Sequence, residues 1–286
     1  SSGFACCGYL VLVLASNCPM DCGYCFLQEY VNDNPGLQLY ANYADAFEEL
    51  ERLRHDSPNR QLRIGTGELA DSLAFDRMTA VSRELVEYFA RTNLTLELKT
   101  KTDEIEHLLE ADPKGRTLVS WTLSPPRVYE ATEHRTASPS ARIAAAARVL
   151  EAGYRIAFHL DPIIAYDGAA HDYATLLDEL FATIAPTRIA FISLGGLRMT
   201  PKLRALARRR FPADAMLCGE DVLSPDGRYR TFTPMRLRLY TMLGEKIHQA
   251  APGLQRYLCM ENASVHERVF GTAPMPPAQL GTSLAH

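Results

Sequence analysis

The stretch ASNCPMDCGYCFLQEY, residues 15–30, decides how this chain is interpreted, because it holds three of the seven cysteines. Cys18, Cys22 and Cys25 are spaced C-x3-C-x2-C, and neither a histidine nor a fourth cysteine stands nearby to complete a tetrahedral set. Thiolates at such a spacing can bind zinc or an iron–sulfur cluster. The stretch therefore predicts a site with three thiolate ligands and one open position.

The sequence around this stretch indicates an α/β fold. Short apolar runs recur along the chain, each followed by an amphipathic stretch, which is typical of parallel strands with helical crossovers. We expect strands at residues 9–15, 62–65, 94–98, 117–123, 155–160 and 188–194. We expect helices at residues 43–54, 72–91 with Ser72 as N-cap, 102–110, 140–152 and 171–184. Six such units predict a partial TIM-type (β/α)6 barrel, with the cysteines in the loop after the first strand.

The pattern changes after the sixth expected strand. It predicts a basic helix at residues 200–210, a hairpin or turn at 224–229, a helix at 234–249 and a proline-rich terminal arm. We therefore predict a barrel over residues 1–196 and a C-terminal hairpin and helix extension over 197–286, packed on the barrel.

Composition excludes several classes of protein. The net charge of −4 over 286 residues gives no overall basic field, although residues 198–238 hold ten Lys or Arg against four Asp or Glu. The longest apolar run, residues 9–15, is far too short to cross a bilayer. An odd, clustered set of cysteines favours a reducing, cytoplasmic setting, and we expect a monomer. Because the chain begins SSGF without Met, we expect that the natural N-terminus is missing.

The other cysteines leave two kinds of metal site open. Cys6, Cys7, Cys218 and Cys259 are distant in sequence, yet one of them could still close a zinc site. The residue types favour a [4Fe–4S] cluster with one free iron. Such an iron could bind the amino and carboxylate groups at the methionine end of S-adenosylmethionine. Apart from Cys259, the distant cysteines are interpreted as structural.

With Tyr24 directly before its last cysteine, C-x3-C-x2-C after a first strand resembles the radical S-adenosylmethionine (radical SAM) superfamily. The resemblance implies that Cys18, Cys22 and Cys25 bind a [4Fe–4S] cluster whose open iron chelates S-adenosylmethionine. It also implies an external one-electron reductant of the flavodoxin or ferredoxin type. Tyr24 and Phe26 are assigned to cofactor binding beside the cluster.

Three further stretches fit a cofactor site. RIGTGELADS ends the second strand with Gly65, Gly67 and Glu68, where glycines allow close backbone approach and a carboxylate can bind the cofactor's ammonium group. The alternative is a strand-ending turn with a solvated Glu68. The other two stretches are LELKTKTDEIEHLL, with Lys101, and SWTLSP, with Ser124. By resemblance, Lys101 and Ser124 bind the carboxylate of the cofactor. The alternative for Lys101 is a solvated charge at a helix start.

A closer resemblance, to the spore photoproduct lyase-like family, rests on NCPMDCGYCFLQEY, LRIGTGELADSLAFD, LELKTK, SWTLSP and YLCMEN. It implies the same partial barrel and the repair of a pyrimidine photoproduct in DNA. The alternative is a radical SAM tailoring enzyme for a small metabolite or peptide. Two departures favour that alternative, since the family has a hydrogen-donating cysteine at the position of Glu68 and a tyrosine at that of Phe26. The hydrogen donor, and whether the cofactor is consumed or regenerated, stay open.

The remaining candidates concern the reaction itself. Tyr24 and the Cys259 thiol are candidate catalytic residues, although free cysteines are usually small buried apolar residues. His159 and Asp161 are candidates for substrate binding at the end of the fifth strand, or a pair that braces the barrel.

The basic segment is the candidate for DNA binding. Arg228 and Tyr229 of the hairpin are expected to contact damaged DNA together with residues 208–210. The alternative for the arginine run is the solvated face of a helix.

Overall fold

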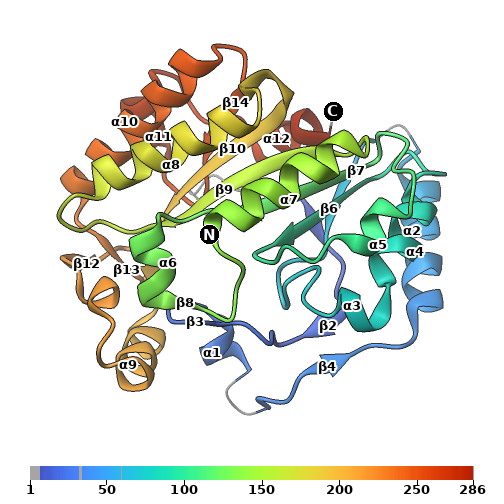
Figure 1. The fold of residues 1–286 in the computed structure, drawn as a ribbon, viewed down its shortest axis with the longest axis horizontal. Helices are drawn as coiled ribbons and strands as arrows, with labels where there is room; N and C mark the ends of the chain where they lie inside the picture. The colour runs from blue at the N-terminus through green and yellow to red at the C-terminus, as the bar shows by residue number, and fades with distance from the viewer. Residues whose placement is uncertain (1–6, 32–33, 59, 286) are drawn as a thin grey trace.

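The computed structural model of the chain describes residues 7–31, 34–58 and 60–285, so Cys6 lies outside the described residues. None of the helices in this part of the chain is both long and apolar enough to cross a membrane. Figure 1 shows a curled sheet with helices on its outer side and short strands at one end.

One parallel sheet forms the centre of the molecule, in the strand order β1-β5-β6-β7-β9-β10-β14. Its strands are β1 (Leu10–Val11), β5 (Arg63–Gly65), β6 (Thr95–Thr100), β7 (Thr117–Thr122), β9 (Arg155–Ile163), β10 (Ile189–Gly196) and β14 (Gln255–Leu258). Because the strand order follows the chain order, successive β/α units wind in one direction, as in a barrel. The predicted partial barrel is confirmed.

Alternation along the strands decides what lies on each side of the sheet. Leu96, Trp121 and Phe158 are buried in the main apolar cluster that includes the helices, whereas Glu97 and His159 contact each other inside the curled sheet. Since neighbouring residues of a strand point to opposite faces, the outer face is apolar and the inner face carries the polar groups.

The helices follow the strands as expected, although their bounds differ from the expected ranges. They are α1 (Leu27–Tyr30), α2 (Tyr43–Asp56), α3 (Asp76–Thr79), α4 (Val81–Phe89), α5 (Glu106–Leu109), α6 (Pro126–Thr132), α7 (Pro139–Glu151), α8 (Ala169–Thr183), α9 (Pro201–Arg210), α10 (Thr233–Ala250), α11 (Ala263–Phe270) and α12 (Pro277–Ala285). The start of α7 is capped by the Ser138 hydroxyl, which accepts a hydrogen bond from the amide of Ala141.

The single helix predicted over residues 72–91 is wrong. Ala80 adopts a left-handed conformation (φ 49°) and separates α3 from α4, while the Asp76 carboxylate accepts hydrogen bonds from the amide and hydroxyl of Ser82. Ser72 is no N-cap either, because its hydroxyl accepts from the amide of Lys99 at 3.0 Å. Ser72 instead ties the loop after β5 to β6.

The C-terminal part supplies a strand, β14, and two helices, α11 and α12, that the sequence pattern did not indicate. β14 pairs in parallel with β10 and is the seventh strand of the sheet. The terminal segment forms α12 in place of the expected arm; its Leu280 and Leu284 pack with Leu118 and Phe191 inside the sheet. The boundary at residue 196 stays a prediction, with residues on both sides of it in one sheet.

Short antiparallel pairings organise the loops. β2 (Ala15–Ser16) pairs with β4 (Gln38–Leu39), and β3 (Asp21–Cys22) pairs with β8 (Glu133–His134). A three-stranded sheet has the order β11-β13-β12, from β11 (Arg198–Met199), β12 (Asp221–Leu223) and β13 (Tyr229–Thr231). Gly227, at φ 76°, turns the predicted hairpin between β12 and β13.

Candidate functional site

A cavity of about 800 Å³ lies where the cysteine loop meets the ends of the parallel strands. Its walls come from the cysteine loop and α1, the loop after β5, the ends of β6 and β9, and the segment around β11. The sequence candidates that line it are Cys18, Cys22, Tyr24, Cys25, Phe26, Gly67, Glu68, Lys101, Asp161 and Arg228. This is the edge of a barrel where active sites are built.

The cysteine loop is fixed by backbone contacts. Gly23 donates its backbone amide hydrogen to the carbonyl of Thr132, and the side-chain amide of Gln28 donates to the backbone carbonyl oxygens of Cys22 (3.1 Å) and Gly23 (2.9 Å). A Cβ atom at position 23 would lie 2.6 Å from the Thr132 hydroxyl oxygen. Only glycine therefore fits between the second and third cysteines in this position.

The three thiols share the cavity and are all free. Burial raises the pKa of Cys18 to about 12, and burial also raises the pKa of Cys22 and of Cys25, against the opposing effect of the Lys101 ammonium group on the last two. A bound metal cluster would therefore displace the thiol protons.

The placement of the thiols bears on the kind of metal site. Among the described residues, no group of three or more His, Cys, Asp or Glu side chains is arranged to hold a single metal ion. A structural zinc site needs four protein ligands, whereas a [4Fe–4S] cluster with one open iron would use the three thiolates alone. The donor set thus fits an iron–sulfur cluster better than a zinc ion.

Lys101 lies beside this loop, as the sequence predicts for a cofactor residue. Its ammonium group sits 5.6 Å from the centre of the Tyr24 ring, and its amide donates to the Asp71 carboxylate at 2.7 Å. Burial opposes the charge of Lys101, but the thiol of Cys22 and the Glu133 carboxylate raise its pKa. Asp71 also accepts from the Thr100 hydroxyl and was not predicted.

The residues of the Gly-rich turn after β5 lie in two different places. Gly67 and Glu68 line the cavity, and a Cβ atom at Gly67 would lie 2.9 Å from the Cβ of Lys99. Gly65 lies against Tyr9, where an added Cβ would come within 2.7 Å of the ring. The Tyr9 hydroxyl donates to the Glu68 carboxylate at 2.8 Å. Gly65 thus makes room for the ring that holds Glu68.

A buried carboxylate, Glu133, was missed by the sequence analysis. It accepts hydrogen bonds from the hydroxyls of Tyr24 and Ser124 and forms an ion pair with Arg142 at 2.6 Å. Burial opposes ionisation of Glu133, but the charges of Arg142 and Lys101 lower its pKa. Ser124 is fully buried and is not among the cavity-lining residues. Its predicted contact with the cofactor stays a prediction.

His159 and Asp161 have different surroundings. Asp161 lines the cavity and forms a two-point ion pair with Arg198, at 3.0 and 3.1 Å. Burial opposes its charge, yet Arg198 and Lys99 lower the pKa of Asp161 to about 2. His159 lies deeper, 3.2 Å from the Glu97 carboxylate, and burial with the nearby Lys99 ammonium lowers its pKa to about 4.

The other candidates also fall into two groups. Phe26 and Arg228 line the cavity. Tyr229 stacks against the Arg204 guanidinium at 4.4 Å, and the amide of Cys259 donates to the Leu194 carbonyl. Tyr229 and Cys259 are not among the cavity-lining residues, although Met260, next to Cys259, is.

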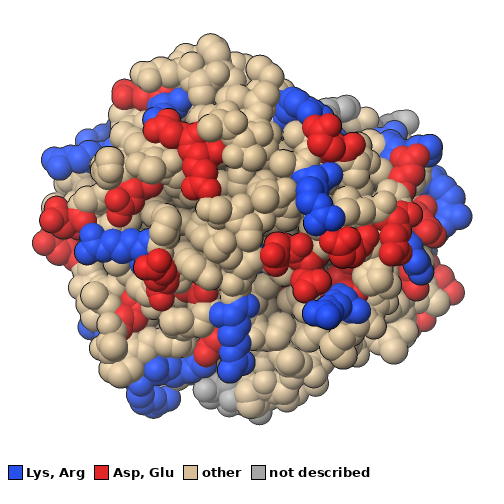
Figure 2. All heavy atoms as spheres, viewed as in Figure 1, with Lys and Arg blue, Asp and Glu red and all other residues tan. Residues whose placement is uncertain are grey.

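The arginine run at the end of α9 lies beside the cysteine loop. Arg210 forms an ion pair with Asp21 at 2.8 Å and donates to the Gln28 side chain at 2.6 Å. Figure 2 shows Lys and Arg side chains gathered at the lower left, in the region of α9. Arg210 therefore holds the cysteine loop, while Arg209 of the same run faces solvent.

Comparisons with known proteins point to one family. A family model described as spore photoproduct lyase matches residues 6–229. The spore photoproduct lyase of a Geobacillus species is 26% identical over 202 residues, which are 70% of this chain and 59% of that protein. That of Bacillus subtilis is 26% identical over 171 residues, 59% of this chain and 50% of that protein. The chain thus spans between half and three fifths of these relatives.

Solved structures match in fold. A spore photoproduct lyase complexed with dinucleoside spore photoproduct has a TM-score of 0.79 and 24% identity, covering 86% of this chain and 75% of the other. A mutant lyase with bound AdoMet and the same dinucleoside has a TM-score of 0.80, with coverages of 87% and 76%. SuiB of Streptococcus suis, bound to S-adenosylmethionine, has a TM-score of 0.57 at 14% identity, covering 94% and 53%.

Proposed function

The chain belongs to the spore photoproduct lyase family, and on this premise we propose that it is a radical SAM enzyme that acts on a pyrimidine photoproduct in DNA. The observation that carries the proposal is the meeting of three free thiols with Lys101 and the Gly67 turn in one cavity at the mouth of a partial barrel.

The chain's own residues divide the work of cofactor binding. Cys18, Cys22 and Cys25 would hold a [4Fe–4S] cluster, and the Gly67 turn and Lys101 would hold S-adenosylmethionine. When bound, the pair supplies one-electron cleavage of the cofactor, which starts hydrogen abstraction from the substrate. Tyr24 is held by Glu133 and Lys101, so its ring is fixed next to the last cluster ligand. The protein contributes position and the exclusion of water.

Charge in the cavity supports an anionic substrate such as DNA. Five cationic side chains line it, against four acidic ones: Lys99, Lys101, Arg198, Lys202 and Arg228, and Glu29, Glu68, Asp71 and Asp161. Asp161 and Arg198 neutralise each other, which leaves four cationic side chains against three acidic ones. Arg228 is 40% exposed at the hairpin, where a phosphate could reach it.

The proposed function also implies an electron donor for the cluster. A flavodoxin- or ferredoxin-type reductant would supply the electron, and the chain would work as a monomer in the cytoplasm. The candidates for the hydrogen-atom donor are Tyr24 and Cys259. Cys259 would need a path past Met260, since Met260 lines the cavity and Cys259 does not.

A second candidate function is the tailoring of a small metabolite or peptide. The observation in its favour is Glu68, which lines the cavity with a hydrogen bond from Tyr9 at the place where the family has a thiol. A carboxylate cannot donate a hydrogen atom as a thiol does. In this function Glu68 would accept a hydrogen bond from a positive or hydroxyl group of the substrate, in place of the ammonium group of the cofactor.

One experiment separates the two functions. The cluster is reconstituted anaerobically, and 5′-deoxyadenosine and repaired pyrimidine are followed with an oligonucleotide containing the spore photoproduct and with its undamaged counterpart. The repair function predicts faster cofactor cleavage and repaired product with the damaged strand alone. Equal cleavage with both strands and no repaired product would overturn it and leave the tailoring function.

A further inference from the structure

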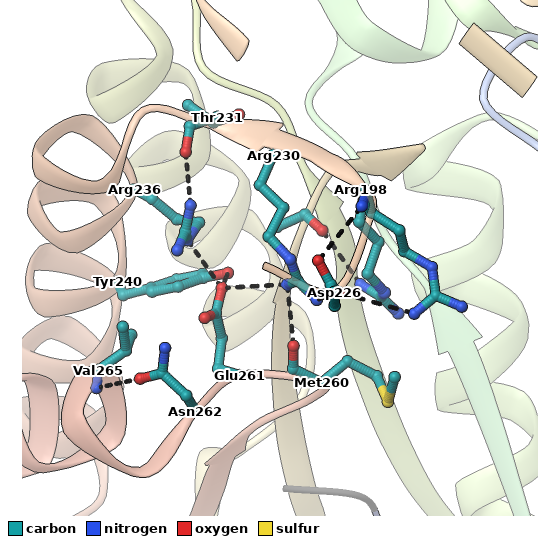
Figure 3. Close-up of polar contacts among 12 residues, drawn as sticks. Arg198, Asp226, Arg230, Thr231, Arg236, Tyr240, Met260, Glu261, Asn262 and Val265 are labelled. Atoms are coloured by element: carbon teal, nitrogen blue, oxygen red, sulfur yellow. Dashed lines mark hydrogen bonds and ion pairs between the residues drawn. The ribbon is translucent and has the colours of Figure 1, made fainter. Parts of the chain in front are cut away.

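A buried polar network stands behind the part of the cavity wall that Arg228 and Met260 form. At its centre is Glu261, 1% exposed, in the loop after β14. Its carboxylate accepts from the Tyr240 hydroxyl at 3.0 Å and pairs with Arg236 at 2.7 Å and with Arg230 at 3.8 Å. Figure 3 shows these side chains converging from α10, β13 and the loop.

The network is built of charges that are out of contact with water. The side chains of Arg230 and Arg236 are 3% and 6% exposed. A buried carboxylate between two arginines is costly unless its partners stay in place, so the three elements that supply them are held together. The second Glu261 oxygen has no hydrogen-bond partner among the described residues, which makes its two charged partners more important.

Arg230 differs from Arg236 in what else it contacts. Its guanidinium donates to the backbone carbonyl of Met260 at 2.9 Å and pairs with the Asp226 carboxylate at 2.7 Å. Arg236 instead donates to the backbone carbonyl of Thr231, at the end of β13, the strand that precedes its own helix α10. Of the two arginines, Arg230 is therefore the one that hydrogen-bonds to Met260 and to Asp226, whereas the stem of Arg236 lies next to Gly196 of the cavity wall.

Both of those links end at the cavity. Met260 lines it and adopts a left-handed backbone conformation, φ 56°, which is unfavourable for a residue with a side chain unless its surroundings hold it. Asp226 accepts from the amide of Arg228 at 3.3 Å and lies 3.8 Å from its guanidinium, and Arg228 lines the cavity. Arg230 thus restrains one apolar and one cationic member of the wall.

The surrounding sequence adds support at both ends. Asn262, next to Glu261, caps α11 by accepting a hydrogen bond from the amide of Val265 at 2.9 Å. Arg230 itself lies opposite Arg198 in the pairing of β11 with β13, and Arg198 holds Asp161 in the cavity. The network therefore sits between two fixed segments.

We propose that Arg230, anchored by Glu261, is a positioning residue that sets the substrate-facing wall of the cavity by holding Met260 and the Asp226–Arg228 turn. This proposal rests on the proposed function and concerns the substrate side of that same site. Arg230 does not touch the substrate; it acts through the Met260 backbone and through Arg228.

The test compares two lysine variants of matched chemistry. Arg230→Lys and Arg236→Lys each keep a buried cation beside Glu261, but lysine has no planar fork that reaches two acceptors at once. We expect both variants to lose some thermal stability. We expect only Arg230→Lys to raise KM for the photoproduct oligonucleotide about tenfold with kcat little changed. Asp226→Asn, which leaves the core pair intact, is expected to change KM in the same direction by a smaller factor.

A measurement without substrate completes the test. Hydrogen exchange of the Met260 and Glu261 amides is followed in the three variants and the unchanged protein. Faster exchange in Arg230→Lys but not in Arg236→Lys supports the positioning role, and equal exchange and equal KM in the two lysine variants overturn it. If the unchanged protein fails to bind the damaged strand in preference to the undamaged one, the proposed function fails, while the exchange comparison still decides the role of Arg230.

Discussion

The two sides of the cavity are built differently. On the cofactor side, the cysteine loop is fixed by short backbone contacts, with glycine at position 23 and the Gln28 side chain bound to two carbonyls of the loop. On the substrate side, the wall depends on ion pairs between distant residues, such as Asp161 with Arg198 and Arg230 with Glu261. The ligands of the cofactor side therefore form a local motif that distant residues such as Thr132 and Arg210 hold in place, whereas the substrate side consists of long-range charge pairs.

This difference has a functional meaning. A cluster and its cofactor are the same in every member of a superfamily, so a short motif is enough to build their site. Both departures from the family, Phe26 and Glu68, line the cavity with the cysteine loop, whereas charges on the other side can be exchanged by changing one pair.

Removing the local motif is expected to abolish the cofactor side. Changing Cys18, Cys22 and Cys25 together to Ala removes all three thiolate ligands, so the reconstituted protein should contain essentially no iron or sulfide and should lack the visible absorbance of a cluster. Cys218→Ala, at an exposed cysteine, is the control and should keep full iron content. Iron retained by the triple variant would contradict the assignment.

Replacing one buried carboxylate on each side of the cavity by an amide should affect iron binding on the cofactor side alone. Glu133→Gln leaves Arg142 buried without its counter-ion, and the free energy of unfolding should fall by about 3 kcal/mol. Because Cys22 pairs with Glu133 across β3 and β8, the variant should also bind iron less tightly. Glu261→Gln should destabilise the protein with iron binding intact. Denaturant titration and iron analysis measure both; equal iron loss in the two variants would remove the contrast.

As the pH falls, the contribution of His159 to the free energy of unfolding should be lost before that of Asp161. The pKa of His159 is lowered to about 4 in the folded protein, below its ordinary value of about 6.5. The unfolded chain therefore takes up the proton first, so the contribution is present above about pH 6.5 and is lost as the pH falls toward 4.

Between pH 7 and pH 5 this should cost about 1 to 2 kcal/mol of unfolding free energy. The stabilising effect of Asp161, whose folded pKa is about 2, should decline only as the pH falls from about 4 toward 2. Urea titrations of the unchanged protein and of His159→Gln give the measurement. The same slope with pH in both proteins would exclude His159 as its origin.

The smallest effect is expected on the exposed arginine run. Arg209 is exposed at the end of α9, so Arg209→Ala should change the unfolding free energy by less than about 0.5 kcal/mol. Non-specific DNA binding should weaken modestly and should depend less on salt. Arg238→Ala, also exposed but on α10, is the matched control. Binding that falls equally in both variants would assign the effect to net charge alone.

The contrast between the two sides also explains what the sequence could predict. The barrel strands were recognised because each is a compact apolar run, and the three cysteines because their spacing is local. β14 was missed because QRYL carries two polar residues, and its place in the sheet depends on pairing with β10 some sixty residues earlier. The break at Ala80 was missed because VSREL continues a helical pattern that the Asp76 side chain interrupts.

Site residues follow the same rule. Lys101, Gly67 and Glu68 could be found because they end strands, and the structure brings them into the cavity with the cysteines. Glu133, Arg198 and Arg230 gave no comparable signal, because a charged residue that is buried in a pair has the same sequence appearance as one in water. A weak signal existed for Asp71, which follows Glu68 by three residues in the same loop.

The central claim is that three cysteines hold a cluster whose remaining iron is open to S-adenosylmethionine. Electron paramagnetic resonance of the reduced, reconstituted protein, recorded with and without S-adenosylmethionine, tests it most directly. We predict the spectrum of a [4Fe–4S]⁺ cluster that changes when S-adenosylmethionine is added and does not change with 5′-methylthioadenosine, which lacks the amino and carboxylate groups, at the same concentration. A spectrum that S-adenosylmethionine leaves unchanged, or a protein that binds zinc and no iron, would contradict the claim.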